Sequence, residues 1–227
     1  MLVQLLAALS ITASPIMAVH SLRVRAHDDS LMINVTVDSA RRQIVVTAGP
    51  FPLPAMPAGM RHEHGYGSPV LRFVSPVAGW IRGYRITLED SSGAPLPRAV
   101  IHHIGVADFE RRELAYPMVE RIFAAGKETP EVKLPAAIGV PIALGEQLGL
   151  YEGFHNETGR DLPAAYVRVA ILWTPTHGHK PLGVLPFYAE VKNDVGGHSW
   201  YDIPPGRSTR RAGFDWKMPR RGRCSCD

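Results

Sequence analysis

The amino-acid sequence predicts an all-β protein: an antiparallel β-sandwich of the jelly-roll type, followed by the incomplete start of a second β domain. Two observations support this fold class. First, 20 prolines and 21 glycines divide the 227 residues into short runs that could not continue as long helices. Second, the runs between them alternate apolar with polar residues or are rich in β-branched residues, which favours strands.

The expected strands follow one another along the chain with turn residues between them. Asp90–Pro95 and Asn156–Asp161 are such turns, rich in Asp, Asn, Ser and Gly. We also expect one helical turn over residues 118–125. The strand-like segments are residues 32–37, 43–47, 70–74, 80–88, 100–106, 147–151, 165–173 and 187–191.

Proline-rich segments suggest where the chain divides. Residues 50–69 are rich in Pro, Met, Gly and His, and we expect a loop there because proline cannot donate to a strand ladder. This loop would join an N-terminal strand pair (19–49) to the main sandwich (70–178). Residues 179–227 are too few to form a core of their own, so we expect an incomplete second lobe with a basic tail.

The first 18 residues are mostly apolar and end in small residues, which is typical of a signal peptide. The stretch is shorter than the ~20 apolar residues of a membrane span. We therefore expect a secreted or periplasmic protein that is not integral to the membrane after signal removal. The alternatives are a mis-assigned start and a buried strand.

The net charge is +4, and much of the positive excess lies in residues 207–223. Aromatic residues are not interleaved with these charges, so we expect no nucleic-acid partner. Cys224 and Cys226 are too close in sequence to form a good disulfide. A Cys-x-Cys pair can bind a soft metal, but we interpret it as an incidental part of the tail.

Three histidines are the main candidates for a metal site. His102 and His103 lie in an apolar, β-branched run, and His155 follows a strand-like segment. Neutral imidazole suits copper or zinc. Adjacent residues of a regular strand point to opposite faces, so the pair can share a metal only if the strand bends or bulges. The alternative is one buried, hydrogen-bonded histidine and one exposed histidine.

Weaker candidates lie in the methionine-rich loop. His62 and His64 would point to one side of an extended chain, and the thioether of Met60 beside them suits copper. The alternative is an exposed polar loop. His177 and His179 have the same spacing, in a segment that we expect to be a linker.

Other patterns indicate less chemistry. Nucleophile elbows, phosphate loops, dinucleotide fingerprints and His-Glu-x-x-His motifs are absent from the sequence. Tyr151 and Glu152 closely precede His155, so they are candidates for partners that orient its ring. The mixed charges of residues 108–113 predict a solvated face.

Several features of the sequence occur in a fixed order along the chain. They are residues 80–86, Asp90, Gly93, Leu96-Pro97, His102-His103, Leu134-Pro135, Gly139, Gly149-Leu150, residues 154–158 and residues 167–175. With this order the chain resembles, over about residues 70–175, the first copper lobe of the copper type II ascorbate-dependent monooxygenases, the peptidylglycine α-hydroxylating monooxygenase family. The resemblance implies that His102, His103 and His155 ligate an electron-transfer copper, which relays electrons to a second copper in the next lobe.

The chain also departs from that family. Residues 204–223 resemble the lead-in to the second copper site, but the expected His-x-His does not follow. We therefore expect a truncated or frame-shifted product whose hydroxylation activity is lost or impaired, and we assign no catalytic residue. The resemblance implies a small-molecule reductant or a peptide-like substrate as partner.

Three hypotheses stay open at this point. The first is an exported copper-binding sandwich that keeps the electron-transfer site. The second is a non-catalytic exported β-sandwich that binds a partner and uses its histidines structurally. The third is a periplasmic copper-handling protein that uses His62, His64 and the nearby methionines.

Overall fold

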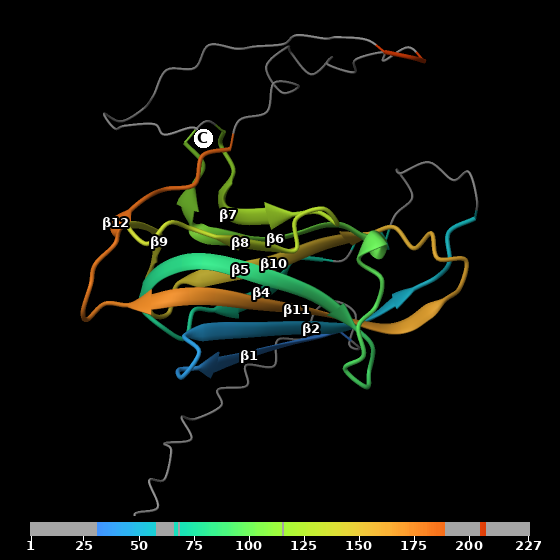
Figure 1. Cartoon of the computed structure of the whole chain (residues 1–227), viewed down its shortest axis with the longest axis horizontal. Coiled ribbons are helices and arrows are strands. Elements are labelled where there is room, and N and C mark those ends of the chain that lie inside the picture. Colours follow the sequence, from blue (N-terminus) through green and yellow to red (C-terminus); the bar gives the residue numbers. More distant parts are fainter. Residues whose placement is uncertain (1–30, 58–65, 68, 115, 189–204, 208–227) are drawn as a thin grey trace, which may run out of the picture.

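The structure is a computed structural model that describes residues 31–57, 66–67, 69–114, 116–188 and 205–207. Strands make up nearly all of its regular structure (Figure 1), so the predicted all-β class is confirmed. A single turn of 3₁₀ helix, η2 (Arg98–Val100), leads into β6. The strands are β1 (Met32–Asp38), β2 (Gln43–Leu53), β3 (Tyr66–Gly67), β4 (Leu71–Val74), β5 (Gly79–Glu89), β6 (Ile101–Arg112), β7 (Val119–Ala125), β8 (Glu131–Lys133), β9 (Ile138–Ile142), β10 (Gln147–Phe154), β11 (Leu162–Pro175) and β12 (Leu182–Gly183).

The strands form two sheets that pack as a sandwich (Figure 1). The seven-stranded sheet has the order β1-β2-β11-β5-β9-β12, with β8 also paired to β5, and the five-stranded sheet has the order β3-β10-β6-β7, with β4 paired to β10. Alternating residues of both sheets, such as Ile86 and Val169 from one and Val106 and Leu150 from the other, are buried in the core. Burial of these apolar side chains is the main force that holds the sheets together.

The helical turn expected over residues 118–125 is wrong, because this segment is strand β7. Glu120 and Ile122 are buried while their neighbours are less so, which is the two-residue period of a strand. A glutamate occupies one of the buried positions, so the apolar alternation was not visible in the sequence.

The loop predicted to begin at residue 50 is also wrong for its first residues, because β2 continues to Leu53. Phe51 and Leu53 pair with β11, while the register is irregular around the prolines between and before them. The prolines therefore make the ladder irregular but do not end the strand. Because β2 lies between β1 and β11, the N-terminal strand pair belongs to the same sheet as β5.

Residues 182–188, which follow β11, contact the sandwich at two places. Leu182 pairs in parallel with Ile138 of β9, and the guanidinium carbon of Arg121 lies 3.2 Å from the ring centroid of Tyr188. The expected signal peptide, most of the expected second lobe, and Cys224 and Cys226 lie outside the described residues. Within the described part of the chain, no helix has the length and apolarity that crossing a membrane requires.

The solvated face expected over residues 108–113 is wrong for two of its carboxylates. Asp108 and Glu113 are buried, and Asp108 is fully enclosed. Each lies against a guanidinium, Asp108 against Arg111 and Glu113 against Arg121. Burial of a charge is tolerated when it is paired in this way, and the sequence does not show where these partners come from.

Candidate metal site at the ends of β6 and β10

A bulge in β6 sets the positions of the two adjacent histidines. Gly153 pairs with His103, but the next residue, Phe154, pairs with Ile101, so His102 is an extra residue in β6. As a result Ile101 and Ile104 are both buried, while His102 and His103 are both exposed between them. This is the irregularity that two neighbouring histidines need if they are to face one side of a sheet.

The third histidine is brought to the same place by the turn after β10. The N–H of His155 donates to the carbonyl of Val100 at 2.8 Å, just before the bulge, and the residue is buried. The adjacent Asn156 is buried as well. Its amide nitrogen donates to the carbonyls of Leu53 and Arg160, both at 2.8 Å, and its Oδ1 accepts from the hydroxyl of Thr158 at 2.6 Å. These bonds hold the backbone beside His155 in a single position.

The three imidazole rings lie together, as the sequence predicted. The ring centroids of His102 and His155 are 4.2 Å apart and the rings are nearly parallel, at 17°. The centroids of His102 and His103 are 5.0 Å apart, with the rings inclined at 58°. Two exposed histidines and one buried histidine therefore form a compact cluster at one end of the five-stranded sheet.

Glycines in β6 and β10 make room for the cluster. A Cβ atom at Gly153 would lie 2.7 Å from Cε1 of His103, so this imidazole rests directly on the backbone of β10. A Cβ atom at Gly105 would lie 2.2 Å from the hydroxyl of Tyr151, whose ring centroid is 6.0 Å from that of His103. The sequence reasoning missed these roles, although glycine inside a strand is a known sign of close approach.

The electrostatic environment favours the neutral form of His103. The ring of His103 is partly removed from water where it lies against Gly153, and this desolvation, with the charge of His155 beside it, lowers the pKa of His103 below its usual value. A neutral imidazole has a lone pair that it can offer to a metal, whereas an imidazolium does not.

The residues expected to orient His155 have other positions. The ring of Tyr151 lies beside His103. Strand alternation places Glu152 on the inner side of β10 with Leu150 and Phe154, away from the histidines. Both carboxylate oxygens of Glu152 are buried without a hydrogen-bond partner, and burial raises its pKa to about 8. Glu152 is therefore a protonated core residue at neutral pH.

The cluster fits a metal ion by donor type and by proximity, but its rings are not yet oriented for one. Among the described residues, no three His, Cys, Asp or Glu side chains are already arranged to hold a metal ion. The near-parallel stacking of His102 and His155 is consistent with this, because a metal ion lies close to the plane of each imidazole that binds it, and two stacked parallel rings do not share a plane. A rotation of the exposed His102 side chain would be needed to bring the nitrogens together.

The remaining candidates are separate from this cluster. His177 and His179 are exposed and follow β11, whereas His155 precedes the start of that strand. His62, His64 and Met60 lie outside the described residues. Comparison of the chain with family models, with curated proteins and with solved structures finds no match.

Proposed function

We propose that the protein is an exported copper-binding β-sandwich whose single copper ion is held by His102, His103 and His155. The observation that carries the proposal is the bulge in β6, which turns both adjacent histidines to the side where His155 lies. A bulge exposes two polar residues in succession on a strand that is otherwise buried, and such irregularities are conserved features near functional sites in many sheets.

Copper suits this set of donors better than a hard cation does. All three side chains offer imidazole nitrogen, and imidazole binds copper and zinc in preference to magnesium or calcium. When bound, copper can accept and release a single electron. The exposed His102 and His103 leave the cluster accessible to a small-molecule reductant, while the buried His155 and its hydrogen-bonded turn keep one ligand fixed.

The proposed role is electron transfer, by resemblance to the first copper lobe of the ascorbate-dependent monooxygenases. Two of the three ligands, His103 and His155, are restrained in a way that supports such a role. Gly153 and Tyr151 restrict the ring of His103, and Asn156 fixes the backbone at His155. A site whose ligands move little between two oxidation states exchanges electrons with little reorganisation.

Copper content is the first measurement that tests the proposal. The chain is reconstituted with copper(II), desalted and analysed by mass spectrometry, and we expect about one copper per chain. His103→Ala and His155→Ala should each lose it. His179→Ala is the matched control, because His179 is exposed and lies beyond the far end of β11.

The result also separates the proposal from a binding module with structural histidines. If the wild-type chain holds no copper, and His155→Ala only lowers the melting temperature, the histidines are scaffold and the copper proposal is wrong. If copper is retained by His155→Ala, the metal binds elsewhere in the chain. A reducible copper(II) signal in paramagnetic resonance, lost on adding ascorbate, would support the electron-transfer role.

A further inference from the structure

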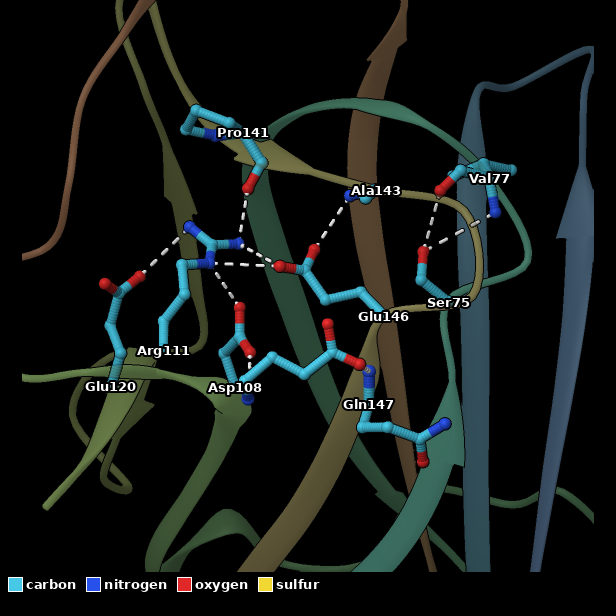
Figure 2. Close-up of polar contacts among 10 residues, drawn as sticks. Ser75, Val77, Asp108, Arg111, Glu120, Pro141, Ala143, Glu146 and Gln147 are labelled. Carbon is cyan, nitrogen blue, oxygen red and sulfur yellow. Dashed lines mark hydrogen bonds and ion pairs between the residues drawn. The ribbon is translucent and has the colours of Figure 1, made fainter.

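A second polar cluster lies at the opposite end of β6 and β10, around Arg111 (Figure 2). Three carboxylates surround its guanidinium group. Nε lies 2.5 Å from Oδ2 of Asp108, Nη1 lies 3.3 Å from Oε1 of Glu120, and Nη2 lies 2.9 Å from Oε1 of Glu146. Nη2 also donates to the carbonyl of Pro141 at 2.7 Å. The cluster thus ties together β6, β7, β9 and the turn before β10.

An irregularity in β6 creates this arrangement. The register with β7 moves from Asp108–Glu120 directly to Arg112–Val119, so residues 109–111 are extra in β6. In a regular strand, residues three apart point to opposite faces and cannot touch. The bulge turns Arg111 back over Asp108, which explains the contact between them.

The cluster contains more negative than positive charge, and it is buried. The side chains of Asp108, Glu120 and Glu146 are 0%, 2% and 8% exposed, and that of Arg111 is 22% exposed. One guanidinium can balance one of the three carboxylates. The carboxyl of Glu113 also acts on Glu120 and adds to the negative side, although Glu113 has its own partner in Arg121.

Buried excess charge of this kind is relieved by binding a proton. Uncompensated carboxylates in the interior are costly, so the folded state retains a proton that the unfolded chain would release. Burial, opposed by Arg111 and assisted by the neighbouring carboxylates, raises the pKa of Glu120 to about 7. Burial and the adjoining Asp108 also raise the pKa of Glu146. Glu120 and Glu146 share these neighbours, so their titrations are coupled to one another.

We propose that the cluster of Asp108, Arg111, Glu120 and Glu146 is a proton-operated latch that holds β7 and the 143–146 turn against β6 and loosens when its proton is released. Three segments depend on it: β7 through Glu120, β9 through Pro141, and the turn through Glu146, whose Oε2 accepts the N–H of Ala143 at 2.7 Å. The latch acts on β7 first, because β7 is the last strand of its sheet and its ladder with β6 is interrupted on both sides of Asp108.

The direction of the effect follows from where the proton binds more tightly. The pKa of Glu120 is higher in the folded protein than its value of 4.5 as a model compound. Its contribution is therefore fully present below about pH 4.5 and is lost as the pH rises through about 7. Above that point the folded state has released the proton as well, and the effect levels off. The latch shares no residue with the histidine cluster, so its test uses the metal-free chain.

Hydrogen exchange of the full, metal-free chain between about pH 5 and pH 8 tests the latch. After correction for the intrinsic exchange rate, protection of amides 119–125 should fall by up to about ten-fold per pH unit and level off near pH 7. The amides of β5 and β11 should change much less. Protection of 119–125 that is constant over this range, or a slope shared equally by β5 and β11, would overturn the proposal.

Single substitutions identify the carboxyl that causes the pH dependence of protection in residues 119–125. Glu120→Gln removes the titrating group but keeps its shape, so protection of residues 119–125 should become nearly independent of pH. Glu131→Gln is the control, because Glu131 is paired on the exposed surface with Arg85 and Lys133 and should leave the slope unchanged. If Glu120→Gln does not fold, Glu146→Gln is judged by the same criterion. A variant that folds and keeps the wild-type slope would contradict the latch.

Discussion

The two ends of β6 and β10 carry polar clusters with opposite properties, although both begin at a bulge in β6. At the start of β6 the bulge lies at the surface, and it exposes two imidazoles that the backbone holds in place. At the end of β6 the bulge folds a guanidinium back over buried carboxylates. The same backbone device therefore produces an accessible site of neutral donors at one end and an enclosed network of charges at the other.

This difference predicts which substitutions disturb the acid end (Asp108, Arg111, Glu120 and Glu146) and which disturb the histidine end (His102, His103 and His155). The acid end is sensitive to the loss of a charge, because its carboxylates are already removed from water. The histidine end is sensitive to small changes of shape, because His103 rests directly on Gly153 and His155 depends on one turn. Changes at the acid end should therefore be detected as changes in stability, and changes at the histidine end as changes in metal content.

Removing the cation of the acid end should have the largest effect. In Arg111→Met, three buried carboxylates lose the guanidinium that they share, and we expect a loss of about 3–5 kcal/mol in the free energy of unfolding. Urea unfolding at neutral pH measures it, and acidification should recover part of the loss. Arg85→Met is the control, because Arg85 is 60% exposed and water screens its pair with Glu131, so its loss should change stability much less. Equal losses in the two variants would contradict the picture of the acid end.

Glu152 lies between the two ends of β10. Its carboxyl is buried without a hydrogen-bond partner, so it can be compared with the buried carboxylates that are paired with Arg111. Its pKa of about 8 in the folded protein lies above the ordinary value of 4.5, so its contribution to stability declines as the pH rises through about 8. Glu152→Leu should therefore be more stable than the wild type near pH 9, by about 1–4 kcal/mol, and should show a smaller pH slope. Thermal unfolding over a pH series measures both. A variant that is less stable than the wild type near pH 9 would show that the carboxyl has a stabilising role in the core.

Sequence reasoning found the strands whose alternation is apolar and failed where a charge or a proline occupies a strand position. The run at 32–37 became β1 almost unchanged. Segment 118–125 did not appear as a strand because Glu120 occupies a core-facing position, and residues 50–53 did not because of their prolines. The pattern of residues within one segment cannot reveal that Glu120 is buried, because its partner, Arg111, comes from a bulge in a different strand.

The site was predictable in composition but not in geometry. The pair His102-His103 and the later His155 stood out in the sequence, and the structure brings their rings together. The bulge that allows this is a property of strand pairing, because it appears only when Gly153 and Phe154 are matched to β6. The acid cluster was missed for the same reason, since Glu120 and Glu146 come from other strands and turns.

A pair of glycine substitutions on β10 should separate stability from metal binding. Gly153→Ala places a methyl group 2.7 Å from the ring of His103, so we expect a loss of about 1–3 kcal/mol together with loss of copper. Gly149→Ala, on the same face, meets the ring of Phe109 at 2.5 Å and should cost a similar amount, but keep copper. Urea unfolding and copper analysis of both variants test this. If both variants keep copper, or both lose it, the contact between the ring of His103 and Gly153 does not determine copper binding.

The smallest expected effect is a shift within the histidine end itself. Burial is the larger cause of the lowered pKa of His103, and the charge of His155 is the smaller. In metal-free His155→Ala the second cause disappears and the first stays, so the pKa of His103 should rise but stay below its usual value. Proton NMR titration of the ring signals measures it, with His179→Ala as the control. A pKa that does not change would mean that the two rings are farther apart in solution than their shared neighbour His102 implies, and the cluster would then lack the compactness that a shared metal ion needs.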